Sequence, residues 1–326
     1  MIDRRRFLKS SIVGGAAALA LPNAAARLLG ATARAAISEP LLELAAGETL
    51  ITILHTNDTH SQIDPIAETD QRNGGKGGVA RRATLVKQVR KDNPNTLMID
   101  AGDVFQGTPY FNFYKGEVEY KSMSLIGYDV VTLGNHDFDN GVDALATAMK
   151  FANFEFVSTN YDVKGTALES RVKPYAVRTF GDVRVGLFGL GISPDNLITP
   201  ENFKGVKYLD PVRMARGAVR LLREQEKCQL VVGMSHLGYY PNAKGNEIGD
   251  TQLAAQVSGI DFIASGHTHT FMDKPVLQKN PDGQDTIIFQ VGKSGIFVGR
   301  VDFKLKDGKV VASAGRLLDL RHESLA

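Results

Sequence analysis

The sequence has a single cysteine, almost no net charge and, after its first 36 residues, no long apolar segment. Cys228 cannot form a disulfide within the chain, so an oxidising compartment would be tolerated without being exploited. It lies beside an apolar, strand-like run, and we expect it in or near the core.

The 38 basic and 36 acidic residues leave a formal net charge of +2. Such a mixed surface lacks the basic field that a nucleic-acid polymer requires, so DNA and RNA polymers are disfavoured as partners. Hydrophobic residues make up 43% of the chain and charged residues 23%, which is typical of a soluble globular protein with ample material for a core.

The first 36 residues form an export signal in our interpretation. Residues 3–9, DRRRFLK, resemble a twin-arginine motif, an apolar stretch follows over residues 10–29, and Ala33-Arg34-Ala35 has the small-x-small pattern of a cleavage site. We therefore predict a signal over residues 1–36, a linker over 37–49, one main domain over 50–326, and export to the periplasm. If the signal is not cut, its apolar stretch of about twenty residues could anchor the chain in a bilayer.

Apolar β-like runs alternate with helical patterns along the main domain, which predicts an α/β fold with a parallel or mixed sheet flanked by helices. The expected strands are residues 50–55, 96–100, 128–133, 154–157, 229–234 and 261–264, and the expected helices are 79–91, 117–126, 140–149, 211–222 and 251–257. We predict a β-hairpin that consists of residues 175–180 and 183–190, with its turn at Gly181-Asp182. We expect the later runs, 286–291, 296–303 and 310–314, to close a second sheet.

Polar side chains follow five of these expected strands. The carboxyl ends of strands in open α/β sheets are where such folds place their sites, so these side chains are expected to meet. Carboxylate, amide and imidazole ligands at five strand ends predict a two-metal hydrolytic site. The five stretches are Asp58-Thr-His60, Gly102-Asp103, Gly134-Asn135-His136, Ser235-His236 and Gly266-His267-Thr-His269.

Two cations about 3.5–4 Å apart need a bridging carboxylate and terminal ligands on each side. We assign Asp103 as the bridge, because it lies between two glycine-containing turns. One metal is expected to take Asp58, His60 and His269, and the other Asn135, His236 and His267. Mixed nitrogen and oxygen ligation suits Mn²⁺, Zn²⁺ and Fe alike, and two such ions would leave a net positive site for a phosphate ester.

His136 is next to a ligand but is expected to project toward the leaving-group oxygen. Its ordinary pKa near 6.5 suits proton donation, and Asp137 or Asp139 could orient its ring. We therefore predict His136 and Asp137 as the catalytic residues. His55, in mid-strand, is expected to be a core histidine, and His322 a solvated residue of the C-terminal tail.

These motifs, in their order along the chain, resemble the calcineurin-like metallophosphoesterase superfamily. Residues 54–60 (LHTNDTH), 102–107 (GDVFQG) and 134–139 (GNHDFD) are similar to its bacterial 5′-nucleotidase and UDP-sugar hydrolase branch. The resemblance spans residues 50 to about 303. It implies a four-layer α/β/β/α sandwich and hydrolysis of phosphomonoesters, most simply 5′-nucleotides, by a metal-bound hydroxide.

Members of that branch normally carry a second domain that grips the nucleoside. The resemblance therefore supports the reaction better than the substrate, and two explanations stay open: a separate C-terminal-domain protein supplies nucleotide specificity, or the enzyme is a less selective phosphatase. Alternative activities are hydrolysis of cyclic nucleotides, UDP-sugars or other phosphoesters. An alternative that is not an enzyme is a non-catalytic, metal-bound subunit of a two-chain nucleotidase.

Overall fold

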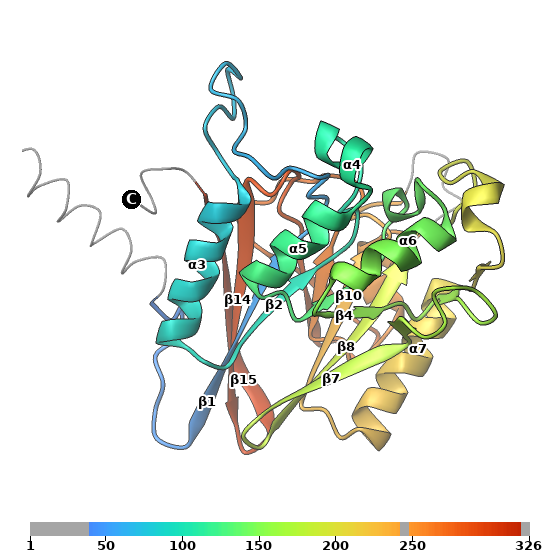
Figure 1. Cartoon of the computed structure of the whole chain (residues 1–326). Helices are drawn as coiled ribbons and strands as arrows, with labels where there is room; N and C mark the ends of the chain where they lie inside the picture. The colour runs from blue at the N-terminus through green and yellow to red at the C-terminus, as the bar shows by residue number, and fades with distance from the viewer. Residues whose placement is uncertain (1–38, 242–247, 321–326) are drawn as a thin grey trace, which may run out of the picture.

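Two facing β-sheets form the centre of the computed structural model, which describes residues 39–241 and 248–320 (Figure 1). The larger sheet contains, in spatial order, β15 (Lys309–Asp319), β14 (Phe297–Lys306), β1 (Glu48–Thr56), β2 (Thr96–Asp100), β3 (Val130–Val131), β4 (Glu155–Val157) and β6 (Val172–Lys173). The smaller contains β12 (Val276–Lys279), β13 (Asp285–Phe289), β11 (Phe262–Ser265), β10 (Leu230–His236), β8 (Val183–Gly191) and β7 (Tyr175–Phe180). A short pair, β5 (Tyr161–Asp162) and β9 (Lys207–Tyr208), stands apart.

Side chains alternate between the two faces of each strand of the larger sheet, as the pleat requires. On β1, Ile51 and Ile53 pack into the core between the sheets, whereas Leu54 packs against the outer helices. On β2, Leu97 and Ile99 face inward and Met98 faces outward in the same way. The central strands of the larger sheet are therefore buried on both faces, and each such aliphatic side chain contributes about 1.5–3 kcal/mol by burial.

Helices cover the outer face of each sheet. The larger sheet is covered by α3 (Val79–Asp92), α5 (Glu117–Ile126) and α6 (Val142–Ala148), seen in front in Figure 1. The smaller sheet is covered by α7 (Pro211–Arg220) and α8 (Asp250–Gln256). These layers confirm the expected α/β/β/α sandwich. The remaining helical segments are α4 (Pro109–Tyr114), at the upper edge in Figure 1, and the single turns η1 (His136–Phe138), η2 (Met149–Phe151), η3 (Pro200–Phe203) and η4 (Leu221–Gln225).

Several local expectations are confirmed. The helix expected from residue 211 begins there as α7, and the Asp210 side chain caps it by accepting a hydrogen bond from Arg213 N at 2.6 Å. Strands β7 and β8 form the predicted hairpin, paired from Tyr175↔Phe188 to Phe180↔Val183. Cys228 is buried.

The placement of the last strands was predicted wrongly. We expected residues 296–303 and 310–314 to close the second sheet, but β14 pairs antiparallel with β1, and β15 pairs with β14. Both therefore extend the larger sheet. The alternation of a strand's residues shows that it has two faces but does not identify its neighbour, which is set by contacts distant in sequence.

Other elements were missed or predicted too long. The pattern did not indicate α4, β12 or the short strands β5, β6 and β9, and only Val130–Val131 of the expected strand 128–133 is paired as a strand. Conversely, β1 begins at Glu48, within the predicted linker. The proposed signal and His322 lie outside the described residues.

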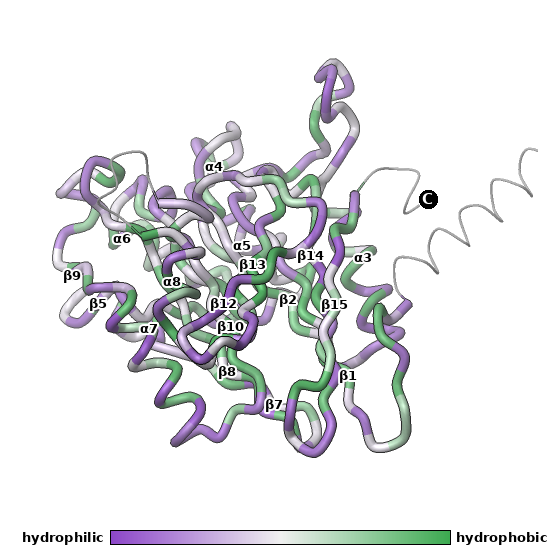
Figure 2. The backbone as a smooth tube through the Cα atoms, turned by 180° about the vertical axis from the view of Figure 1, so that it is seen from behind, coloured by the Kyte–Doolittle hydropathy of each residue, from purple (hydrophilic) through white to green (hydrophobic). Residues whose placement is uncertain are grey.

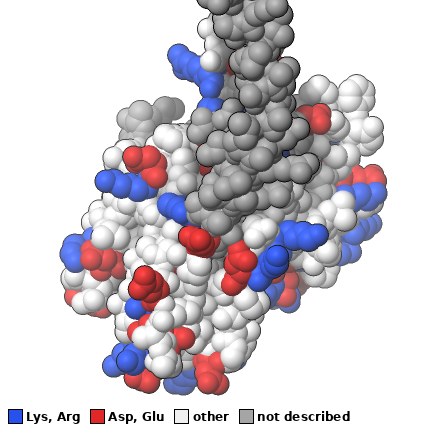
Figure 3. Space-filling view, turned by 90° about the vertical axis from the view of Figure 1, so that its left-hand side faces the viewer, with Lys and Arg blue, Asp and Glu red and all other residues white. Residues whose placement is uncertain are grey.

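The surface and interior follow the composition. Figure 2 shows hydrophobic segments along interior strands such as β8 and β13, with hydrophilic segments in the outer loops. On the face shown in Figure 3, the visible acidic and basic side chains are interspersed. Within residues 39–241 and 248–320, no helix has both the length and the hydropathy needed to cross a membrane.

Candidate metal centre

The five predicted motifs meet at one edge of the two sheets. Strands β1, β2 and β3 are parallel neighbours in the larger sheet, and β10 and β11 are parallel neighbours in the smaller one. The turns that follow these strands carry two groups of side chains, each with ligand atoms within 4.8 Å of one another. The first group is Asp58, His60 and His269, and the second is Asp103, His236 and His267.

The first group brings two imidazoles and a carboxylate together. Nε2 of His60 lies 2.9 Å from Nε2 of His269. Asp58 Oδ1 is 3.3 Å from His269 Nε2 and 3.9 Å from His60 Nε2. Three donor atoms therefore converge, in the residue combination predicted for one metal.

The second group adjoins the first. His236 Nε2 lies 3.0 Å from Asp103 Oδ2 and 3.9 Å from Asp58 Oδ1, so it faces a carboxylate of each group. Asn135 Oδ1 is 3.1 Å from Nδ1 of His267, which places this predicted ligand beside the group. The bridging role assigned to Asp103 stays a prediction.

Hydrogen bonds at the far side of two rings leave their inner nitrogens available for a cation. The Nδ1 of His236 is 2.7 Å from the carbonyl of Ala101, and Nδ1 of His60 is 3.2 Å from that of Phe105. Because a carbonyl only accepts, both Nδ1 atoms donate and both Nε2 atoms carry a lone pair when the rings are neutral. His236 Nε2 is buried and makes no well-formed hydrogen bond to any residue that the structure describes, so a metal ligand role fits this atom.

The electrostatics of the site favour a bound positive charge. Burial alone would lower the pKa of His236, but the carboxylates of Asp103 and Asp58 outweigh it and raise this pKa to about 10. Burial lowers the pKa of His267 to about 4, and it also lowers that of His60. The carboxylates of Asp103 and Asp58 thus favour a positive charge at the centre of the site. The imidazoles of His267 and His60, whose pKa values are lowered, are neutral and suited to metal ligation.

Several of the candidate ligands have an unusual backbone conformation. An extended segment would place Asp58 and His60 on one side of the chain, but their φ angles are +49° and +46°. Asp103, His267 and His269 also have positive φ, at +55°, +71° and +52°. The predicted grouping is found, but left-handed turns rather than an extended chain produce it, at a cost on the order of 1 kcal/mol per residue.

Gly134 is required because there is no room for a side chain at this position. Its φ is not positive, but a Cβ at this position would lie 2.2 Å from Asp103 Oδ1 and 2.7 Å from His236 Cε1. Any larger residue would therefore displace the second group. Gly102 does have a positive φ, +90°, and its Cβ would lie 2.5 Å from Gly134 N.

His136 lies at the partly exposed side of the centre. Its ring centroid is 5.5 Å from that of His60, and its Nδ1 is 3.0 Å from Asp139 Oδ2. The hydrogen bond to Asp139 raises the pKa of His136. Of the two aspartates expected to orient this ring, Asp139 is the one placed against it.

Asp137, which we had predicted to be catalytic, is buried and faces the backbone. Its carboxylate accepts hydrogen bonds from the N–H groups of Gly134 (2.8 Å), Asp103 (3.1 Å) and Val104 (3.1 Å). Burial raises its pKa to about 7. The geometry makes Asp137 a positioning residue that ties the turn after β2 to the turn after β3.

Sequence reasoning missed two further positioning residues. Asn57 donates to Asp58 Oδ2 and to the carbonyl of Gly292, both at 2.7 Å. Gln290, after β13, donates to Ser265 Oγ and to the carbonyl of Gly266 at 2.7 Å, and its Oε1 accepts from the N–H of Thr270. Gln290 thus clamps both ends of the turn that carries His267 and His269. Asn57 lies inside the first motif and could have been found, whereas nothing near Gln290 in the sequence identifies it.

His55 is a core residue, as expected. It is completely buried between β1 and the second sheet, with ring centroids 5.4 Å from Phe262 and 5.2 Å from Phe289. Neither ring nitrogen has a hydrogen-bond partner among the described residues, and burial lowers its pKa to about 3. It is therefore a neutral, packed ring outside the ligand groups.

Two facing sheets with paired ligand groups at a common edge define a metallophosphoesterase-type fold. The chain belongs to the calcineurin-like phosphoesterase family, whose model matches residues 51–271. Members of this family use two divalent cations, and the structure has two ligand groups, one for each cation.

Among its relatives are several 5′-nucleotidases. The chain is 33% identical to the 5′-nucleotidase of Bos taurus, with 81% of this chain and 48% of the relative covered. It is 32% identical to that of Vibrio cholerae, with 80% and 50% covered. The solved structure of a 5′-nucleotidase precursor from Thermus thermophilus superposes with a TM-score of 0.76 at 35% identity, covering 85% of this chain and 55% of that one. The chain thus spans about half the length of these relatives.

Proposed function

We propose that this protein is a metal-dependent phosphomonoesterase with 5′-nucleotidase activity. The observation that carries the proposal is the convergence of the two ligand groups, joined by the 3.9 Å approach of His236 Nε2 to Asp58 Oδ1. The relatives named as 5′-nucleotidases support the choice of substrate.

The two groups would hold one divalent cation each, with Asp103 as the bridge and Asn135 completing the second. When bound, two such cations supply an activated water and a counter-charge for the phosphoryl oxygens. The ligand set suits Mn²⁺, Zn²⁺ or Fe.

His136 is the proposed general acid. Its ring is partly exposed beside the first group, and Asp139 holds Nδ1 so that the other ring nitrogen is free to face a substrate. When the ring is protonated, this other nitrogen would donate its proton to the leaving oxygen and neutralise the alkoxide as the P–O bond breaks.

The direct test is phosphate release by the purified, Mn²⁺-loaded chain from a nucleoside 5′-monophosphate and from an aryl phosphate in parallel. We expect hydrolysis of both. Failure to release phosphate from either ester, with two ions bound per chain, would overturn the proposal and favour a non-catalytic subunit. Release of nucleoside monophosphate from a UDP-sugar or a cyclic nucleotide, without release of phosphate from monoesters, would instead favour those activities.

We further propose twin-arginine export to the periplasm, because Arg4 and Arg5 precede Phe7-Leu8-Lys9. Replacing both arginines by lysine should leave the protein in the cytoplasmic fraction. A separate protein with the second domain implied by the resemblance is a proposed partner, and adding it should raise kcat/KM for nucleotides but not for an aryl phosphate.

A further inference from the structure

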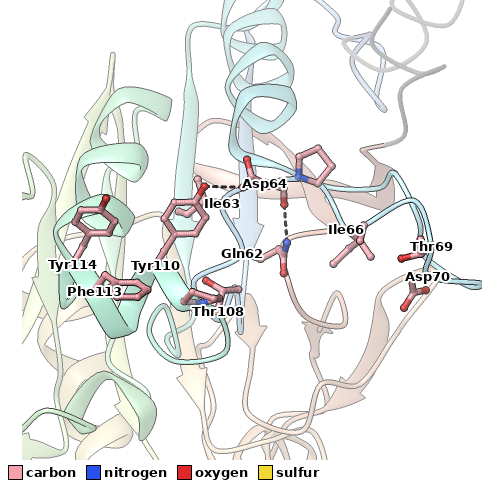
Figure 4. A pocket seen from close by; sticks show the side chains of 13 residues that line it. Gln62, Ile63, Asp64, Ile66, Thr69, Asp70, Thr108, Tyr110, Phe113 and Tyr114 are labelled. Atoms are coloured by element: carbon pink, nitrogen blue, oxygen red, sulfur yellow. Dashed lines mark hydrogen bonds between the residues drawn. The ribbon is translucent and has the colours of Figure 1, made fainter.

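A groove with a volume of about 890 Å³ lies between α4 and the loop after β1 (Figure 4). Tyr110, Phe113 and Tyr114 of α4 form one wall. Gln62, Asp64 and Ile66 are among the residues of the opposite wall. This volume lies within the range of pockets that bind small molecules, and the aromatic lining with a few polar groups is typical of them.

The aromatic wall is not explained by packing. Helix α4 buries only Phe111, whereas the side chains of Phe113 and Tyr114 are 79% and 52% exposed. The rings of Tyr110 and Tyr114 are nearly parallel, with centroids 6.4 Å apart and an interplanar angle of 27°. Exposed ring faces of this kind stack on flat heterocycles with little dependence on base identity.

One hydrogen bond joins the two walls of the groove, and a second lies within the wall opposite the aromatic rings. The Tyr110 hydroxyl donates to Asp64 Oδ2 at 2.7 Å across the groove, and Gln62 Nε2 donates to the carbonyl of Asp64 at 2.8 Å (Figure 4). The aromatic wall is therefore set at a defined distance from a wall that carries amide and carboxylate groups, which can hydrogen-bond the edge of a base.

The groove begins beside the metal centre, although none of the residues of the two ligand groups lines it. Gln62 follows the metal-group residue His60 by two positions, a separation of at most about 7 Å along the chain. On the other wall, a Cβ on Gly107 would lie 2.7 Å from the carbonyl oxygen of His60, so Gly107 is in contact with that residue. The next residue, Thr108, lines the groove and donates to the carbonyl of Ser61 at 2.7 Å. Both walls thus begin beside the first ligand group.

We propose that this groove binds the heterocyclic base of a nucleoside 5′-phosphate whose ester group lies at the metal centre. This inference rests on the proposed function for the position of the ester. It differs from the expectation that a second domain recognises the nucleoside, because here the domain that carries the metal centre supplies the stacking surface. A nucleoside fits better than a simple alkyl ester, since only a flat ring uses the exposed faces of Phe113 and Tyr114.

The test compares the double variant Phe113→Ala/Tyr114→Ala with Leu125→Ala in the full, Mn²⁺-loaded chain. Leu125 is a matched control because it is 87% exposed on the neighbouring helix α5 but does not line the groove. Adenosine binding is measured by calorimetry, and kcat/KM is measured for adenosine 5′-monophosphate and glycerol phosphate. We expect the double variant to lose roughly tenfold in adenosine affinity and in kcat/KM for the nucleotide, with glycerol phosphate unaffected.

Each contrary result has a distinct meaning. Absence of adenosine binding to the unaltered chain, or an equal loss in the Leu125 control, overturns the groove proposal. An equal loss with glycerol phosphate also overturns it, because the aromatic residues would then act on the metal centre. If no ester is hydrolysed but adenosine binds and the double variant weakens it, the proposed function fails while the groove is supported as a nucleoside site.

Discussion

Nε2 of His60 lies 2.9 Å from Nε2 of His269, although the two residues are 209 positions apart in the chain. Since His60 Nδ1 donates its proton to the carbonyl of Phe105, its Nε2 points a lone pair at the other ring. A proton or a cation must lie between two nitrogens this close, and the adjacent carboxylate of Asp58 favours positive charge there.

Asp103→Ala should reduce the number of ions bound per chain from two to one or none. The substitution removes the carboxylate that faces His236 and that we assign as the bridge. The measurement is metal content after dialysis against metal-free buffer. Asp143→Ala, which removes an exposed carboxylate from α6, is the control and should retain two ions. Two ions at full occupancy in the Asp103 variant would show that the bridge is assigned wrongly.

His136→Ala should keep both ions and lose a factor of about 10²–10⁴ in kcat, the usual contribution of a general acid. His136 is not in either ligand group, so its loss is not expected to release metal. Metal content and phosphate release are measured on the same sample. Asp139→Asn should give a smaller loss, because the ring remains but its orienting carboxylate is replaced. Release of an ion from the His136 variant would show that this ring has a structural role in the site.

Gln290→Met should weaken metal binding by about 10–100-fold, although this residue is not a ligand. Methionine has a similar size but cannot replace the hydrogen bonds to Gly266 and Thr270 that clamp the turn of His267 and His269. Competition with a chromogenic chelator measures the affinity. Gln256→Met, at an exposed position at the end of α8, serves as the matched control. Equal affinities for the two variants would mean that the clamp does not position the ligands.

His55→Leu should reduce the acid sensitivity of the fold. In the folded chain the pKa of His55 is lowered to about 3 by burial, so the unfolded chain takes up a proton below its ordinary pKa near 6.5 while the folded chain does not. Unfolding therefore becomes easier as pH falls from about 6.5 toward 3, by up to about 1.4 kcal/mol per pH unit. Leucine removes this effect without breaking a hydrogen bond, since neither ring nitrogen has a partner in the part of the chain that the structure describes.

The test of the His55 prediction is urea unfolding of both proteins at pH 7.5 and 5.5 in the presence of a chelator. The chelator keeps both proteins free of metal. Release of bound metal at low pH would otherwise add its own pH dependence to the unfolding free energy of each protein. The difference in unfolding free energy between the two pH values should be smaller for the variant. Identical differences would contradict the assignment of a neutral His55.

Local patterns were sufficient where local physics sets the structure. Helix α5 was predicted at residues 117–126 and occupies Glu117–Ile126, since its ends are set by glycines on either side. Asp210 caps α7 because an N-cap bond is made within one turn. In contrast, the pairing of β14 with β1 joins residues about 250 positions apart, and nothing in either strand specifies it.

The sequence by itself determined the types of the candidate ligands, their order and their positions after apolar strands, because each motif couples a buried strand to polar residues at its end. Only the tertiary structure decided how these ligands are held. Positive φ angles turn Asp58 and His60 toward one point, and the Asp137 carboxylate ties together backbone amides from two turns. Gln290 clamps a third turn from a different strand. These interactions depend on distances between segments remote in the chain, and such distances exist only after the two sheets have packed face to face.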